Sequence, residues 1–311
     1  MNSQIKKINL NHSFIFFLFC NVFSVVVFKF TNLNISTLFC FLLILTIGVS
    51  HGALDHLKGK KLLTILNIKK FYIFYLIYIL LALSVILVWT IVPAITLIVF
   101  LAVASFHFGK EDTQFLINKN SNLISILYFF RGLLIIITPL YFNFDETVTI
   151  FKMLLIDSEQ FYSSLGFIEK YKIIEIAIGL SALSSIILFL REFNIKKFAI
   201  FLDFFSIIIL NYYLSPLVAF TIYFCFLHSI RHTISLAIEM DNSNLKNGLK
   251  LFAQKAFPLT VLTAILSVLG LYFLNNVYEL NSAILKIIFI GLASLTFPHI
   301  LLEYFLEKNE K

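Results

Sequence analysis

Charged residues are scarce in this chain: they make up 13% of its 311 residues, whereas hydrophobic residues make up 60%. With a mean hydropathy of +0.95, this composition excludes a water-soluble globular domain. The net charge of +7 does not indicate a nucleic-acid partner, because the lysines fall in short loops between apolar runs and are better explained as topology signals. We predict a polytopic membrane protein with a single transmembrane domain over residues 1–311.

Cysteine is also scarce, and its placement excludes two kinds of site. The three cysteines, Cys20, Cys40 and Cys225, lie far apart within apolar runs. They form neither a disulfide framework nor a CxxC metal site, so we expect them to be small core residues. Internal repeats and low-complexity linkers do not stand out either.

The apolar runs predict an all-α helical bundle of about ten membrane spans, and eight to ten are compatible with the pattern, because each span needs roughly 20 apolar residues. The predicted spans are 13–30, 35–56, 71–92, 93–109, 123–143, 172–190, 198–214, 216–239, 256–275 and 283–304. Most of the 24 Lys and Arg residues fall on one side of this arrangement, which predicts that both termini are cytoplasmic. The long connection 144–171 is expected to form an outer interfacial helix or cap.

His228 and His232 lie four residues apart within one of these runs. On a helix this spacing places both imidazoles on one face, where they could share a metal ion. The alternative is two core histidines that bond to backbone carbonyls. Ser229 follows His228, so the HExxH motif of zinc peptidases is absent.

Further histidines fall in the same inner layer of the predicted bundle. They are His51 and His56 in the second span, His107 in the fourth and His299 in the last. Histidine inside a membrane is costly and usually functional. Three of these histidines, His51, His107 and His299, have a carboxylate four residues later, at Asp55, Glu111 and Glu303. Such groups commonly orient ligating imidazoles. An all-imidazole site is compatible with Fe, Zn, Cu or Ni.

Four short motifs resemble one known family. They are Ser50–Asp55 (SHGALD), Phe106–Gly109 (FHFG), Phe226–His232 (FLHSIRH) and Phe297–His299 (FPH). In this order they are similar to those of the Brp/Blh family, membrane-embedded β-carotene 15,15′-dioxygenases that supply retinal to microbial rhodopsins. The resemblance extends from the second predicted span to the last.

The resemblance implies a non-haem Fe²⁺ centre with no catalytic residue beyond the metal. The implied ligands are His51, His107, His228 and His232, and the implied supporting or pocket residues are Asp55, His56, His299 and Glu303. The implied reaction cleaves the central double bond of β-carotene from the bilayer with O₂ and gives two retinal molecules. It implies a multi-pass protein of the bacterial inner membrane, with a microbial rhodopsin as a candidate retinal acceptor.

Two functions from other classes remain open at this stage. Intramembrane histidines with acidic companions also occur in transporters of metal ions or protons. A protein that only binds carotenoid, or delivers it to another protein, would need an apolar pocket but no metal.

Overall fold

The computed structural model describes residues 3–29, 35–117, 121–191 and 194–309, without the side chains of Ser3, Phe28, Lys29 and His51. The described residues form helices and no strand, which confirms the predicted all-α class. The longer helices are α1 (Ser3–Lys29), α4 (Tyr72–Ile91), α5 (Pro93–Thr113), α6 (Asn122–Phe142), α9 (Ile173–Leu190), α10 (Ala199–Tyr213), α13 (Leu245–Leu274) and α14 (Leu280–Asn309). The shorter ones are α2 (Thr37–Leu43), α3 (Asp55–Ile65), α7 (Phe144–Met153), α8 (Glu159–Lys170), α11 (Pro216–Ile222) and α12 (Ile230–Met240).

Nine helical segments in the described part of the chain are long and apolar enough to cross a membrane. They correspond to nine of the ten predicted spans. The tenth prediction, 198–214, contains α10, which has only 15 residues and is therefore about 22 Å long. That is shorter than a hydrocarbon core of about 30 Å. Helix α10 ends at Tyr213, because Leu214 and Ser215 are extended before Pro216.

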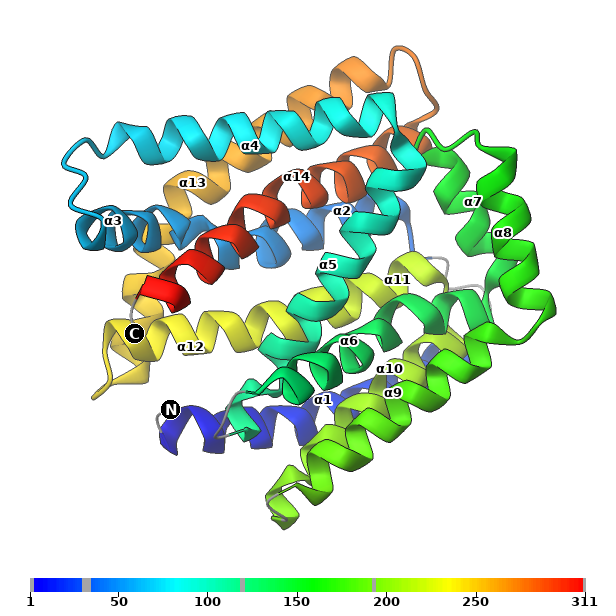
Figure 1. Cartoon of the computed structure of the whole chain (residues 1–311), viewed down its shortest axis with the longest axis horizontal. Helices are drawn as coiled ribbons and strands as arrows, with labels where there is room; N and C mark the ends of the chain where they lie inside the picture. The colour runs from blue at the N-terminus through cyan, green and yellow to red at the C-terminus, as the bar shows by residue number, and fades with distance from the viewer. Residues whose placement is uncertain (1–2, 30–34, 118–120, 192–193, 310–311) are drawn as a thin grey trace.

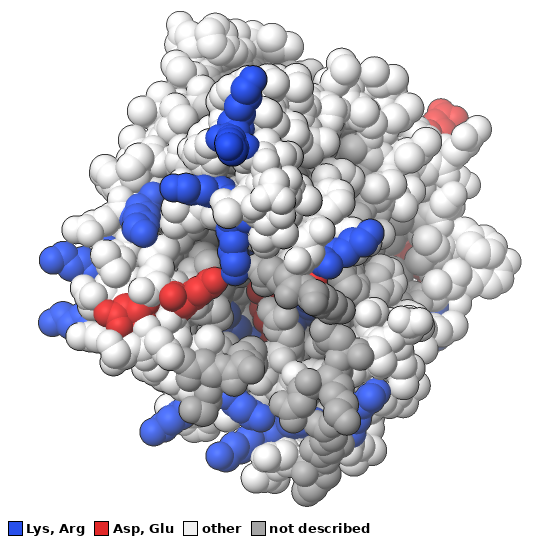
Figure 2. Space-filling model, turned by 60° about the vertical axis from the view of Figure 1, so that its left-hand side comes forward, with Lys and Arg blue, Asp and Glu red and all other residues white. Residues whose placement is uncertain are grey.

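Helix α1 begins and α14 ends at the same end of the bundle, on the left in Figure 1. Figure 2, which turns that side forward, shows many Lys and Arg side chains on this face. The placement of both termini on one side of the membrane, with that side in the cytoplasm, stays a prediction.

Two of the spans contain π turns. Residues 35–56 are divided into α2, the π-helix η1 (Ile44–Gly48), the 3₁₀-helix η2 (Val49–Leu54) and the start of α3. The span from Pro216 contains the π-helix η5 (Tyr223–Ser229) between α11 and α12. The two π turns pack together: the Ser229 hydroxyl donates to the Gly48 carbonyl at 3.3 Å. A Cβ on Gly48 would lie 2.6 Å from the Phe224 ring, so a larger residue at this position would displace the ring.

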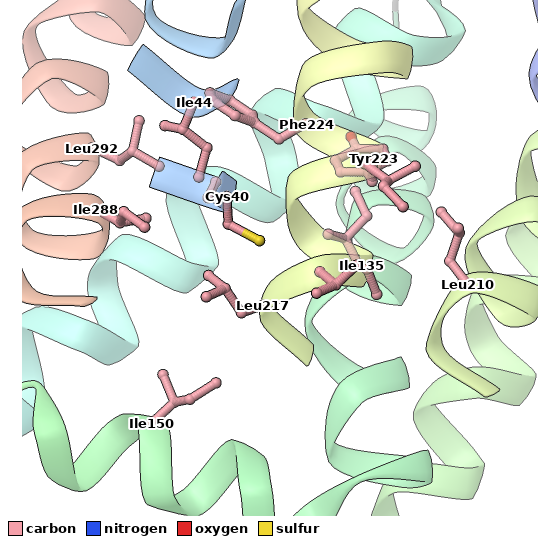
Figure 3. Close-up of a cluster of buried hydrophobic side chains, with 14 of the residues drawn as sticks. Cys40, Ile44, Ile135, Ile150, Leu210, Leu217, Tyr223, Phe224, Ile288 and Leu292 are labelled. Atoms are coloured by element: carbon pink, nitrogen blue, oxygen red, sulfur yellow. The ribbon is translucent and has the colours of Figure 1, made fainter. Parts of the chain in front are cut away.

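The main hydrophobic core joins α2, η1, α11, η5 and α14 (Figure 3). Cys40 is drawn within it, and all three cysteines are buried and unoxidised. This confirms the prediction that they are core residues.

The connection 144–171 forms two short helices, α7 and α8. The Trp89 indole on α4 donates to the Leu154 carbonyl at 2.9 Å, and the Lys286 ammonium on α14 donates to the Met153 carbonyl at 2.5 Å. These bonds tie the end of α7 to the bundle and satisfy two polar side chains within apolar spans.

Helices α5 and α6 approach closely through Gly109 and Gly132. A Cβ on Gly132 would lie 1.8 Å from the Ser105 carbonyl oxygen, and one on Gly109 would lie 1.8 Å from the Tyr128 carbonyl oxygen. Both clashes involve backbone, which cannot move aside as a flexible side chain can. The glycine pair therefore sets the position of the α5 segment that carries His107.

Replacing Gly132 with alanine should separate α5 from α6. We expect Gly132→Ala to lower the free energy of unfolding by about 3 kcal/mol, because overpacking a tight contact forces backbone shifts. The melting temperature of the purified protein in detergent measures this loss. Gly291→Ala on α14 is the control, since a Cβ at this position would meet no neighbouring atom within 4 Å in the described part of the chain. Equal melting temperatures for the two variants would contradict this account of the contact.

Candidate metal centre

Four buried histidines from three spans meet in one cluster. His107 comes from α5, His228 from η5, His232 from α12 and His299 from α14. The ring centroid of His107 lies 5.2 Å from that of His228 and 5.4 Å from that of His299. The centroids of His232 and His299 are 5.6 Å apart. These short separations place all four imidazoles around a common centre.

A carboxylate lies behind each of three of these rings. The Nδ1 atoms of His228 and His232 lie 3.3 Å from Asp112 Oδ1 and 3.2 Å from Glu111 Oε2, respectively. His299 Nδ1 lies 2.8 Å from Asp55 Oδ1. An ionised carboxylate can only accept, so these contacts place the proton on Nδ1 and make Nε2 the candidate metal-binding atom.

Glu303 lies among the remaining nitrogens. Its carboxylate is 3.6 Å from His299 Nε2, 3.8 Å from His107 Nδ1 and 4.0 Å from His232 Nε2. Ligand atoms of His107, His299 and Glu303 all lie within 4.8 Å of one another. Imidazole nitrogens and a carboxylate at such spacing form a donor set that suits a transition metal.

Lys58 also belongs to the site, although its place in the sequence indicated only a topology signal. Its ammonium donates to Glu303 Oε1 at 2.6 Å and lies 3.4 Å from His232 Nε2. The bonded carboxylate compensates the charge of this lysine inside the bundle. Its sequence position three residues after Asp55 was a usable signal, because helical residues at this spacing share a face.

Asp112 and Tyr223 were missed as well. The Tyr223 hydroxyl donates to Asp112 Oδ2 at 2.5 Å while His228 contacts the other oxygen. Tyr223 and His228 are five residues apart, and the π turn η5 allows both to reach one carboxylate. A search at regular helical spacing cannot find this pair.

Arg231 fixes the position of Asp112 through hydrogen bonds. Its guanidinium bonds Asp203 through two oxygens, at 2.8 and 3.0 Å, and donates to the Asp112 carbonyl at 3.1 Å. The structure thus pairs Arg231 with a carboxylate inside the bundle. Asp203 is therefore paired with Arg231 within the bundle.

The other residues that the sequence predicted for the site differ in what the structure shows of them. The side chain of His51 lies outside the described part of the chain, so its role as a ligand stays a prediction. His56 Nδ1 lies 3.0 Å from the Ala53 carbonyl, and His56 borders a cavity beside the cluster. Asp55 serves a histidine on another helix, His299, whereas Glu111 contacts His232 rather than His107 on its own helix.

Two cavities flank the histidines. One, of about 270 Å³, is bordered by His107, His228 and His299 and otherwise mainly by apolar side chains of η2, α4, α13 and α14. The other, of about 670 Å³, lies between α5, α6 and α14 and includes His107, Lys110, Glu303 and Glu307 in its wall. The cluster thus lies between a largely apolar space and one with several charged groups.

Comparison with known proteins identifies a family for this chain. The family described as beta-carotene 15,15′-dioxygenase matches residues 42–307. This chain belongs to that family. A protein from uncultured marine bacterium 66A03, named beta-carotene 15,15′-dioxygenase, is 27% identical over 269 residues, which are 84% of this chain and 90% of that protein. No solved structure matches the chain.

The family match contains all four clustered histidines and their carboxylate partners. It therefore agrees with the resemblance that the short motifs suggested. The match begins at residue 42, so it leaves α1 outside, and α1 supplies no histidine to the cluster.

The carboxylate behind His228 should control metal binding. Asp112→Asn keeps the size of the side chain but removes the charge that fixes the His228 tautomer. We expect metal affinity to fall about 10–100-fold, as is typical when a partner of a ligating histidine is changed. Titration of metal into the metal-free protein measures this change. Glu307→Gln is the matched control, because Glu307 pairs with Lys110 and its side chain is 55% exposed. Equal affinities for both variants would rule out this role for Asp112.

Proposed function

We propose that this protein is an Fe²⁺-dependent dioxygenase that cleaves the central 15,15′ double bond of β-carotene with O₂ and gives two retinal molecules. The observation that carries the proposal is the buried cluster of carboxylate-backed imidazoles beside an apolar cavity in a membrane protein. Membership of the beta-carotene 15,15′-dioxygenase family supports the reaction. We further propose a bacterial inner-membrane location and a microbial rhodopsin as acceptor of the retinal.

The donor set fits iron. Imidazole nitrogen is a suitable ligand for non-haem Fe²⁺, and His107, His228 and His232 belong both to the cluster and to the ligands that the resemblance implies. We keep His51 as the fourth implied ligand. We add His299, because it has the same type of carboxylate contact as His228 and His232. Bound iron would supply the redox chemistry that O₂ requires, which none of the clustered side chains can provide.

The protein residues position the ligands and keep the site dry. Asp55, Glu111 and Asp112 orient the rings, and the Tyr78 hydroxyl secures Asp55 through a 2.8 Å bond to Oδ2. Phe108 and Phe224 pack on His228, with ring centroids at 4.8 and 5.9 Å. These aromatic faces line the apolar cavity and offer a surface that a polyene can contact without loss of hydrogen bonds.

Expression in bacteria that make β-carotene tests the reaction directly. We expect the wild type to bleach the yellow cells and to produce retinal, identified by chromatography. The purified protein should contain iron. A protein that takes up carotenoid without bleaching would instead be a binding protein. A metal transporter would leave the pigment unchanged.

Loss of a ligand should abolish this activity. We expect His228→Ala and His232→Ala each to eliminate retinal formation while the protein still inserts into membranes, since alanine is favourable in a helix. Retinal formation and iron per protein should be measured on purified variants. Normal activity with full iron content in either variant would refute the ligand assignment.

Substitutions of His299 and His56 can distinguish a metal ligand from a residue that only borders the cavity. His299 is buried in the cluster, whereas His56 contacts a backbone carbonyl at 3.0 Å. We expect His299→Ala to lose as much iron as His228→Ala, and His56→Ala to retain most of it. Strongly reduced turnover with only modest iron loss in His299→Ala would return His299 to the supporting role expected from the sequence.

A further inference from the structure

The cavity of about 270 Å³ extends from the histidine cluster to the outer surface of the bundle. Its inner border includes His228 and His299, which are buried. Its outer border includes Ile79 on α4 and Leu262 and Leu266 on α13, which are 55%, 50% and 59% exposed. One continuous space therefore borders both the candidate metal centre and the surface that faces lipid.

Helices α4 and α13 form the two sides of this opening, and they are the most exposed spans in the described part of the chain. In the most apolar window of each span, 6% of α4 and 0% of α13 are buried, compared with 50% of α14 and 72% of the Pro216–Met240 span. Figure 1 shows α4 in cyan and α13 in orange at the upper edge of the bundle, with α14 in red beside them. An apolar molecule in the membrane can thus reach this side without crossing the packed core.

The backbone of α13 is weakened close to the opening. Pro258 lies inside this helix, and proline removes one backbone hydrogen bond and favours a kink. The next residue, Leu259, borders the cavity. The weakened part of α13 therefore lies at the border of the space.

Asp55 and Tyr78, two polar groups along this route, are already bonded. Asp55 borders the cavity, and its carboxylate accepts from Tyr78 and contacts His299. The Tyr78 hydroxyl also lies 3.3 Å from the Leu295 carbonyl. A hydrocarbon that moves through this space leaves these hydrogen bonds in place, which avoids the cost of stranding buried polar groups.

The second cavity is less suitable for a hydrocarbon. Its wall includes the ion pair of Lys110 with Glu307 and the carboxylate of Glu303. Contact with a hydrocarbon would remove water from these charged groups without offering a new partner. The two spaces therefore differ in chemical character as well as in size.

We propose that the substrate, a hydrocarbon dissolved in the bilayer, enters sideways between α4 and α13 through the opening formed by Tyr75, Ile79, Leu262 and Leu266. This inference rests on the proposed function and adds the route by which a fully apolar substrate reaches the histidines. Lateral passage keeps the hydrocarbon out of water, where exposed apolar surface is unfavourable.

Tryptophan substitutions on one helix can test the route. Leu262→Trp and Leu266→Trp should fill the opening, whereas Ile265→Trp is the matched control: Ile265 lies on the same helix, is 52% exposed and does not border the cavity. We expect the two opening variants to reduce retinal formation at least tenfold at low β-carotene in liposomes, with unchanged iron per protein. The control should behave as the wild type.

A substitution in the second cavity tests the alternative entrance. Leu301 borders the second cavity, so Leu301→Trp should affect access only if the substrate enters there. A strong loss in Leu301→Trp together with normal activity in Leu262→Trp and Leu266→Trp would overturn the lateral route between α4 and α13. Equal activity of the opening variants and Ile265→Trp would overturn it as well.

A second readout separates this inference from the proposed function. Protein purified from β-carotene-producing cells can be assayed for retained pigment by its absorbance. If the wild type retains β-carotene without cleaving it, the proposed function fails. The route would still be supported if Leu262→Trp and Leu266→Trp retained less pigment and Ile265→Trp did not. A wild type that neither cleaves nor retains β-carotene would overturn both.

Discussion

The structure depends on pairing charged and polar side chains inside an apolar bundle. An isolated charge in such surroundings is costly, and a paired charge is tolerated only when its remaining hydrogen bonds are also satisfied. Here the pairs form connected sets: Arg231 binds Asp203 and the Asp112 backbone, and Asp112 in turn contacts His228 and Tyr223. Removing one member would take a hydrogen bond from the next. The histidine geometry is therefore determined by groups that extend well beyond the imidazoles.

Regular helices alone would not place these groups together. The chain departs from α-helical hydrogen bonding in η1 and η5, and the two π turns contact each other through Gly48, Phe224 and Ser229. One π turn, η1, precedes His51, and the other, η5, contains His228. Such turns are frequent at functional sites. On the other side of the cluster, the contact of Gly109 with α6 positions His107. Backbone irregularity and close helix approach thus occur where the ligands must converge.

The sequence was sufficient for the features that depend on local composition. Apolar length predicted the membrane helices, and the depth of His107, His228, His232 and His299 along their spans predicted that they share one layer. The sequence could not assign partners between helices, because these depend on how the helices rotate and pack. Glu111 therefore was placed beside His107 by spacing but contacts His232. Tyr223 was missed because a π turn changes which residues share a face, and Lys58 was missed because lysines near span ends usually report topology.

The position of the cluster between two different cavities has a chemical consequence. The proposed substrate is a hydrocarbon, but each product carries an aldehyde at the cleaved end, so polarity appears only at the site of the reaction. The cavity with the opening between α4 and α13 is mainly apolar, whereas the cavity beyond His107 contains Lys110 and Glu307. An apolar chain is accommodated on one side of the histidines, and a new polar end can find hydrogen-bond donors on the other. The ion pair of Lys110 with Glu307 thereby contributes to the difference in polarity across the site.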